Sequence, residues 1–181
     1  MILPIYLYGA SVLREKAELV TPDYPDLKQL IDNMFETMYN AEGIGLAAPQ
    51  VGKPIRLFVV DTANADEPET ERFKKAFINP VILEKSGELF SYKEGCLSIP
   101  NIREDVVRES IVKIRYFDED FNEHTDVYDG TVARVIQHEY DHIEQIMFTD
   151  LLSQLKKKLL KKKLDNIKNG KNMPSFKAKI N

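Results

Sequence analysis

Two histidines and a glutamate stand at a spacing that suits metal-dependent hydrolysis. Residues 137–142, with the sequence QHEYDH, place His138 and His142 four positions apart. On a helix, residues at i and i+4 lie on one face, so both imidazoles can point at a single ion. Glu139 would then stand beside that ion, where a carboxylate can act on a water molecule. The pattern alone also fits an exposed charged helix, and a catalytic site needs a third ligand.

The single cysteine, Cys96, is the candidate for that ligand. A free cysteine is most often a small buried hydrophobic residue, but its thiolate is a good metal ligand beside a cation. One cysteine and two histidines leave the fourth tetrahedral position open, as a catalytic metal site requires. A nucleophilic role for Cys96 fits less well, because both candidate bases are better explained as ligands. The remaining histidine, His124, lies in a polar hairpin, and we expect it to be solvated.

Three polar side chains have candidate roles around such a site. Glu139 would take a proton from water and pass it to a leaving nitrogen, unless it is only a surface carboxylate. Gln50 follows a loop rich in glycine and alanine, and its amide can hydrogen-bond an oxyanion, although such a residue is more often structural. For Asp141 we favour a structural ion pair with an arginine such as Arg108 over a role in orienting a ligand.

Hydrophobic patterning outlines the helices that must position these residues. Apolar residues recur every three to four positions from Leu27 to Met38, which predicts an amphipathic helix that has Pro25 in its first turn and stops before Gly43. A second helix, capped by Asp129 or Thr131 and largely buried, would carry both histidines.

Strands are expected between these helices. The apolar runs at 56–61 and 76–83 predict two strands, with Pro80 at an edge or a bulge of the second. Short strands follow at 89–92 and 111–117, and 123–128 is the hairpin partner of the latter. The acidic segment 62–71 is expected to be an exposed loop.

Composition fits one ordinary domain. The chain has 181 residues, of which 43% are hydrophobic and 30% charged, enough for a proper core. No apolar run is long enough to cross a bilayer, and the apolar N-terminus has no preceding basic region, so we expect no membrane association and no signal peptide. One cysteine excludes an internal disulfide framework and suits a reducing compartment, so we expect a cytoplasmic protein.

Charge is distributed unevenly along the chain. Residues 1–150, the expected catalytic core, carry 15 basic and 28 acidic residues, whereas residues 151–181 carry 10 lysines and one aspartate. Leucines interleave with these lysines and predict a basic amphipathic helix within 151–170, followed by a flexible tail at 171–181. Such a helix is compatible with docking on RNA, although a solvated lysine face is the simpler interpretation.

Three separated blocks together resemble the signature motifs of the peptide deformylase family, in the family's order. They are residues 43–50 (GIGLAAPQ), 94–98 (EGCLS) and 137–142 (QHEYDH). The segment 8–14 and the basic C-terminal helix resemble the family as well, so the resemblance covers nearly the whole chain. It implies an α+β fold, with antiparallel sheets wrapped around a central helix carrying HExxH, and a C-terminal helix. It also implies an enzyme that removes the formyl group from the N-terminal formylmethionine of new bacterial proteins and releases formate.

The resemblance implies a role for each motif residue. Cys96, His138 and His142 would bind the metal. Glu139 would be the general acid and base, and Gln50 with the backbone N–H of Leu97 would stabilise the tetrahedral oxyanion. The peptide would lie extended against strands, and its methionine would enter an apolar pocket. The residues implied for the peptide backbone are Ile44, Gly45, Glu94 and Gly95, and those for the pocket are Ile44, Tyr92, Val135 and the aliphatic part of Arg134.

The ligands leave the identity of the metal open. A Cys/His/His set suits Zn(II), Fe(II), Ni(II) or Co(II), and the resemblance favours Fe(II) as the physiological ion. The resemblance also implies N-formylmethionyl nascent peptides as substrates and contact of the basic C-terminal helix with the ribosome.

The chain departs from the family pattern at two places. Gln145 stands where a glycine is common, which leaves the exit of the histidine helix open. Arg134 stands where an apolar pocket residue is usual, and residues 62–71 look like a variable insertion.

Two other classes of protein remain as alternatives. A zinc endopeptidase also uses HExxH, but it takes a ligand downstream of the helix, where only Glu144 and Asp150 are available. A non-catalytic metal-binding or ribosome-associated module is the second alternative.

Overall fold

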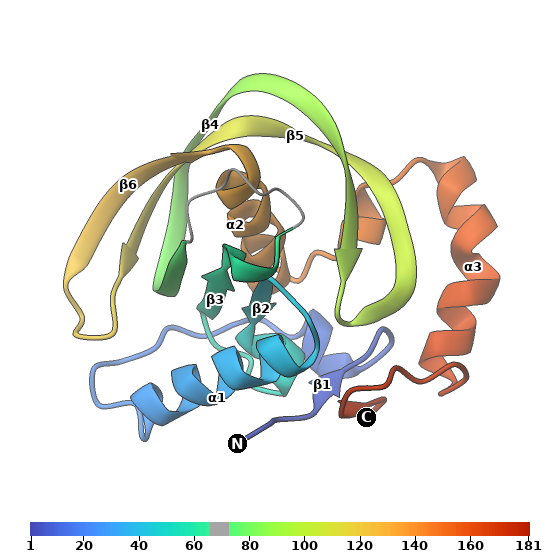
Figure 1. Cartoon of the computed structure of the whole chain (residues 1–181), viewed down its shortest axis with the longest axis horizontal. Coiled ribbons are helices and arrows are strands. Elements are labelled where there is room, and N and C mark those ends of the chain that lie inside the picture. Colours follow the sequence, from blue (N-terminus) through green and yellow to red (C-terminus); the bar gives the residue numbers. More distant parts are fainter. Residues whose placement is uncertain (66–72) are drawn as a thin grey trace.

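The structure is a computed structural model, and it describes residues 1–65 and 73–181 (Figure 1). Most of the expected insertion at 62–71 lies outside the described residues. Its first part is not the exposed loop that we expected. Thr62–Asn64 forms a 3-10 helix. Thr62 is buried and its hydroxyl accepts a hydrogen bond from the Phe73 backbone N–H, whereas Ala63 is exposed.

Five antiparallel strands form the main sheet, in the order β2-β3-β4-β5-β6. Strands β4 and β5 form a long hairpin that arches over helix α2, as Figure 1 shows. Helix α2, Gly130–Ile143, is the central helix of the expected fold, and it packs against β2, β3, β5 and β6. The strands are β2, Gly45–Ala47; β3, Leu57–Asp61; β4, Lys74–Cys96; β5, Ile99–Phe117; and β6, Glu123–Asp129.

The bounds of three expected strands were wrong. The strands predicted at 76–83 and 89–92 are parts of the single strand β4, and the strand predicted at 111–117 is only the last part of β5. The pairing of β4 with β5 shifts register between Ile78 and Val81 and between Ser86 and Leu89. Each bulge interrupts the alternation of buried and exposed residues, so one long strand looks like several short ones. Pro80 lies within the first bulge, as expected.

Helix α1, Leu27–Asn40, ends before Gly43 as predicted. Its N-cap is Asp26, so Pro25 precedes the helix instead of lying in its first turn. Ile31, Met34 and Met38 are fully buried on one face, and together with residues of β2 and β3 they form one hydrophobic cluster. A second cluster surrounds α2, and a third lies beneath the C-terminal helix.

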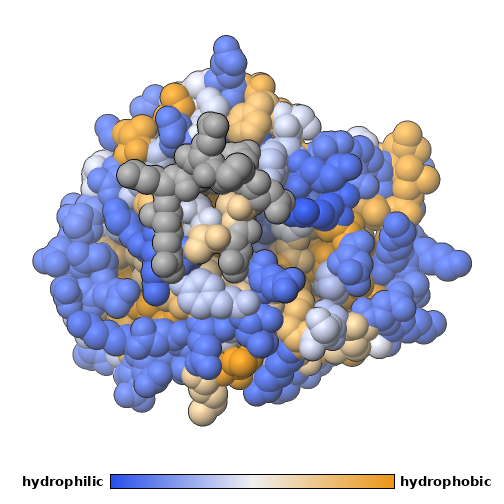
Figure 2. All heavy atoms as spheres, viewed as in Figure 1, coloured by the Kyte–Doolittle hydropathy of each residue, from blue (hydrophilic) through white to orange (hydrophobic). Residues whose placement is uncertain are grey.

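Helix α3, Gln154–Lys168, is the predicted basic helix, and it ends at Asn169 and Gly170. The side chain of Ser153 caps it by accepting a hydrogen bond from the Lys156 N–H. Leu160, Leu164 and Ile167 are buried against the body of the protein. Leu155 and Leu159 of this helix are nevertheless exposed. Figure 2 shows hydrophobic side chains at the upper right, over the start of α3. No helix in the described residues is long and apolar enough to span a membrane.

The tail at 171–181, which we expected to be flexible, contains a strand. Strand β7, Ala178–Lys179, pairs in parallel with β1, Ile5–Tyr6, near the start of the chain. The Ile5 N–H donates to the Lys177 carbonyl at 3.0 Å, and the Leu7 N–H donates to the Lys179 carbonyl at 2.8 Å. These hydrogen bonds hold the tail against the N-terminal segment.

Candidate metal centre and active site

Helix α2 and the end of strand β4 bring the three expected ligands together. His138 and His142 lie one turn apart, with ring centroids 5.1 Å from each other. The Cys96 Sγ lies 3.3 Å from the His142 Nε2. One ligand atom from each of the three residues lies within 4.8 Å of the others, and the described residues contain no second group of this kind.

The donor set fits a divalent cation. A thiol and two imidazoles converge on one point, and they are ligand types that Zn(II), Fe(II) and similar ions accept. Cys96 is half-buried, whereas His138 and His142 are buried, so the site is sheltered from bulk water. Three converging donors leave room for a water or a substrate atom, as a catalytic centre requires.

His124 is not part of this cluster. Its Nε2 lies 2.7 Å from the Asp118 carboxylate, and its ring stacks on Tyr116. His124 is nevertheless partly solvated, as expected, because its side chain is 39% exposed. The downstream ligands that an endopeptidase would need are also engaged elsewhere: Glu144 pairs with Arg56, and Asp150 pairs with Arg14.

Glu94 holds His138 in place. Its Oε2 lies 2.9 Å from the His138 Nδ1, which leaves the Nε2 of that ring to face the cluster. Arg108 donates to both carboxylate oxygens of Glu94, at 2.7 and 3.0 Å, and also to Asp141 at 2.7 Å. The expected Arg108–Asp141 pair is thus present. We call Glu94, Arg108, Asp141 and His138 the inner network.

Sequence reasoning missed this role of Glu94, which the resemblance placed only beside the peptide backbone. Burial alone would raise the pKa of Glu94, but hydrogen bonds from His138 and Arg108 outweigh it and hold that pKa well below its usual range. The available signal was a glutamate and an arginine among the otherwise apolar inward-facing positions of two paired strands.

Glu139 lies beside the three ligands and is buried. Its Oε2 has no hydrogen-bond partner among the described residues, and burial raises the pKa of this carboxyl to about 7. A carboxyl with a pKa near neutrality can both accept and donate a proton.

Strand β2 passes close to Glu139 because residue 45 is a glycine. A Cβ atom at Gly45 would overlap the Glu139 carboxylate and lie 2.8 Å from both the Glu139 Cγ and the Val135 Cγ1. The small residues of the first motif therefore allow the strand to approach the histidine helix.

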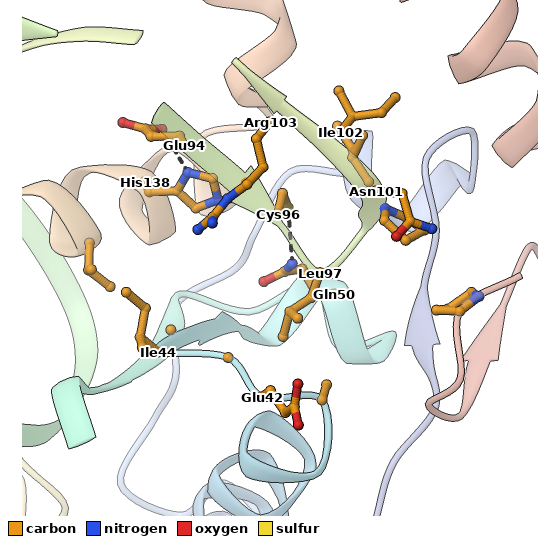
Figure 3. Close-up of a pocket in the computed structure, with 18 of the residues that line it drawn as sticks. Glu42, Ile44, Gln50, Glu94, Cys96, Leu97, Asn101, Ile102, Arg103 and His138 are labelled. Carbon is orange, nitrogen blue, oxygen red and sulfur yellow. Dashed lines mark hydrogen bonds and ion pairs between the residues drawn. The ribbon is translucent and has the colours of Figure 1, made fainter. Parts of the chain in front are cut away.

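Gln50 points its amide nitrogen toward the ligands (Figure 3). Its Oε1 accepts a hydrogen bond from the Ala47 N–H at 2.8 Å, which fixes the orientation of the amide. Its Nε2 donates to the Ser98 hydroxyl at 3.1 Å and lies 3.5 Å from the Cys96 Sγ. Gln50 thus presents N–H groups beside the cluster without carrying a charge.

A cavity of about 650 Å³ opens in front of these groups. Of the three expected ligands, Cys96 and His138 line it. Every residue implied for catalysis or for substrate binding also lines it, so the cavity joins all three motifs. These lining residues are Ile44, Gly45, Gln50, Tyr92, Glu94, Gly95, Leu97, Arg134, Val135 and Glu139. The cavity also has a wall that sequence reasoning missed, formed by residues 173–176.

Both departures from the family pattern have a local explanation. The Arg134 guanidinium donates to Glu94 and to the carbonyls of Val106 and Phe90, and it lies 4.2 Å above the centroid of the Phe90 ring. Its charge is therefore neutralised by the strands although the side chain is buried.

Gln145 adopts a positive φ of 65° directly after the end of α2. The Ile146 N–H donates to the Asp141 carbonyl at 2.8 Å, and the Gln145 N–H donates to the His142 carbonyl at 3.2 Å. This is the Schellman ending that usually takes glycine at this position. Helix α2 therefore ends regularly, and glutamine in place of the usual glycine adds backbone strain at this position.

Comparisons with known proteins identify the family of this chain. The family described as Polypeptide deformylase matches residues 2–158. The chain is 55% identical to a peptide deformylase of Flavobacterium johnsoniae over 189 residues, which cover 99% of this chain and 96% of that protein. It is 50% identical to one of Cytophaga hutchinsonii, covering 99% and 98% of the two chains.

Solved structures give the same result. Peptide deformylase 1B of Arabidopsis thaliana superposes with a TM-score of 0.84 at 35% identity, covering 93% of this chain and 91% of that one. A peptide deformylase from Legionella pneumophila gives a TM-score of 0.83 at 34% identity, covering 96% and 100%. The chain therefore belongs to the polypeptide deformylase family, the metal-dependent hydrolases that remove the N-formyl group from nascent polypeptides.

Proposed function

We propose that Cys96, His138 and His142 hold the metal of this deformylase, and that Glu139 and Gln50 act on the formyl group beside it. The convergence of the three ligand atoms within 4.8 Å of one another, at the wall of a substrate-sized cavity, supports this assignment most directly. A divalent cation held there would supply Lewis acidity, which polarises a carbonyl and makes water more acidic.

Glu139 moves the proton in this proposal. One of its carboxylate oxygens takes a proton from the attacking water, whose oxygen bonds to the formyl carbon. The same carboxyl gives that proton to the amide nitrogen as the C–N bond breaks, leaving formate and a free amine. The partnerless Oε2 and the pKa of about 7 suit a group that must do both.

Gln50 and Leu97 stabilise the negative charge that develops on the formyl oxygen. The Ala47 N–H and the Ser98 hydroxyl orient the Gln50 amide, whose Nε2 carries the N–H groups that donate. The backbone N–H of Leu97 is the second donor that we assign, because Leu97 follows the ligand Cys96 and lines the cavity.

The peptide lies between two backbone segments in this proposal. Its extended chain pairs with residues 44–45 on one side and residues 94–95 on the other, as an added strand would. Its methionine side chain occupies the part of the cavity near Ile44, Tyr92 and Val135, with Arg134 forming part of the wall.

Two variants test these roles. Glu139→Gln should retain the metal and lose nearly all formate release from a formyl-Met peptide, because the amide cannot carry the proton. Cys96→Ser should lower the bound metal, as measured by elemental analysis. Near-normal turnover in Glu139→Gln, or unchanged metal content in Cys96→Ser, would contradict the corresponding role.

We further propose Fe(II) as the physiological ion. A thiolate and two imidazoles suit it, although the same ligands accept Zn(II), Ni(II) or Co(II). Elemental analysis and formate release after anaerobic purification test this assignment. Zinc as the only ion in the active, anaerobically purified enzyme would contradict it.

We also propose that α3 docks the enzyme on the ribosome, in the cytoplasm. The exposed lysines of this helix support the proposal, since basic side chains bind phosphate backbones. Because α3 is packed on the core, charge reversal is a cleaner test than deletion. The triple variant Lys158→Glu, Lys161→Glu, Lys162→Glu should lose co-sedimentation with ribosomes at low salt and keep activity on a short peptide. Unchanged co-sedimentation would contradict it.

A further inference from the structure

The far wall of the cavity comes from the C-terminal tail. Met173, Pro174, Ser175 and Phe176 line the same cavity as Cys96 and Glu139, and we call these four residues the tail wall. They lie outside residues 2–158, the part of the chain that matches the family. This chain therefore adds a surface to the chamber that the three motifs do not supply.

The tail wall is held at both of its ends. Before it, the Lys171 N–H donates to the Asn166 carbonyl at 2.8 Å and so ties the chain to the end of α3. After it, β7 pairs with β1. Phe176 itself packs against the hydrophobic cluster that contains Ile5. Figure 1 shows this segment running beside β1, below the tip of the β4–β5 hairpin.

The chemistry of the tail wall suits an apolar chain segment. Met173 is 44% exposed, and neither it nor Pro174 or Phe176 carries a charge. Leu97, Pro100 and Ile102 of the β4–β5 turn region line the same cavity and are also uncharged, whereas Asn101 and Arg103 beside them are polar. A volume of about 650 Å³ is typical of a pocket for a drug-sized ligand, and it leaves space beyond one formylmethionine.

We propose that the tail wall is a specificity subsite for the residues that follow formylmethionine in the nascent peptide, and that it favours apolar side chains there. The proposal rests on the function proposed above, because the peptide must enter with its formyl group at Glu139. An extended chain advances about 3.3 Å per residue, so successive residues move away from the ligands and along the cavity. Its occupant is the third or fourth residue of the substrate.

Substrate length provides the test. Formate release would be measured for formyl-Met-Ala, formyl-Met-Ala-Leu and formyl-Met-Ala-Ala-Leu, and for the same longer peptides with serine in place of leucine. The enzymes are the wild type, Met173→Ala and Phe176→Ala. Lys171→Ala is the matched control, since this exposed tail residue does not line the cavity.

We expect kcat/KM of the wild type to be higher for the leucine peptides than for the serine peptides. Met173→Ala and Phe176→Ala should lower it about fivefold on leucine peptides, mainly through KM, as expected when part of an apolar contact is lost. Their activity on formyl-Met-Ala should be unchanged, and Lys171→Ala should match the wild type throughout. Because Met173 is exposed, its variant should unfold at the same temperature as the wild type.

Three results would contradict the proposals, two of them the subsite alone and one the proposed function. An identical preference for leucine peptides in the wild type and in both variants would overturn the subsite. A rise in kcat/KM for long peptides in the variants would overturn it too, because the tail would then obstruct the groove. Failure of the wild type to release formate from formyl-Met-Ala would instead overturn the proposed function, and the subsite with it.

Discussion

Strands β4 and β5 each contribute to two networks of charged and polar side chains, which differ in their access to water. The inner network joins Glu94 and Arg108 to helix α2, and these two side chains are each only 4% exposed. The outer network consists of Lys75, Tyr116, Asp126 and Tyr128, whose hydroxyl, ammonium and carboxylate groups lie within 3.3 Å of one another in linked pairs. Its Lys75 and Asp126 side chains are 41% and 38% exposed.

This difference in exposure determines how strongly the charged groups of each network depend on one another. In the inner network water cannot replace a lost partner, so each charged group depends on all the others. In the outer network solvent can replace a partner, and the pairing adds little. The group that orients His138 belongs to the inner network, where its geometry is enforced.

The largest expected effect is that of Glu94→Ala. It would leave Arg108 without its bidentate partner and His138 without its hydrogen bond. Loss of one member of a buried charged set costs about 3–5 kcal/mol of unfolding free energy. Loss of a residue that orients a metal ligand weakens metal binding about 10- to 100-fold. Urea unfolding and metal titration measure the two effects.

Asp126→Ala is the matched control in the outer network. Its effect on unfolding should be at most about 1 kcal/mol, and metal affinity should not change. Equal losses in the two variants would show that burial does not separate the two networks.

Gly45→Ala should have the next largest effect, and we expect this effect on catalysis rather than on stability. The new methyl group would displace the Glu139 carboxylate or push β2 away from α2. Misplacement of a catalytic group by about 1 Å can lower kcat about 100-fold. Stopped formate assays would measure this loss, and normal turnover would show that the strand can shift freely.

Alkaline pH should weaken the outer network. Burial, together with Tyr116 and Asp126, raises the pKa of Tyr128 above its ordinary value of 10.0. Because the folded protein holds this proton more tightly than the unfolded chain, the contribution is complete below pH 10.0 and is lost as the pH rises toward the raised pKa. Tyr128→Phe should therefore show a shallower loss of stability in alkaline solution, as measured by thermal unfolding between about pH 9 and 11. An unchanged slope would assign the loss to other groups.

Gln145→Gly should produce the smallest effect, a gain in the stability of the folded protein. Glycine adopts a positive φ without the clash that Gln145 incurs at 65°. The gain should be about 0.5–1 kcal/mol of unfolding free energy, since glycine's extra freedom in the unfolded chain offsets part of the relief. Activity should not change, because the ligands precede this residue. A loss of stability would mean that the Gln145 side chain makes a contact that outweighs its backbone strain.

The sequence predicted the parts of the molecule that depend on local spacing. The i, i+4 histidines, the amphipathic faces of α1 and α3 and the stop at Gly170 are encoded within a few residues. The extent of β4 and β5 was not predictable, because bulges at Pro80 and near Gly87 disturb the alternation on which strand prediction depends.

Contacts between residues far apart in the sequence could not be predicted either. Glu94 meets His138 across 44 residues, and no local pattern records that distance. The tail wall is a stronger example, because the Lys171–Asn166 hydrogen bond and the pairing of β7 with β1 bring residues 173–176 to the cavity. The motif resemblance named the residues around the metal but contained nothing about this part of the chain.

The pairing of β1 with β7 also sets an order of events during synthesis. Strand β1 is translated before the main sheet and helix α2, and its partner β7 is translated after them. A growing copy of this enzyme therefore assembles its ligands and its sheet while one side of its own chamber is still missing. The chamber is therefore completed late, when residues 173–179 have been made and β7 can pair with β1.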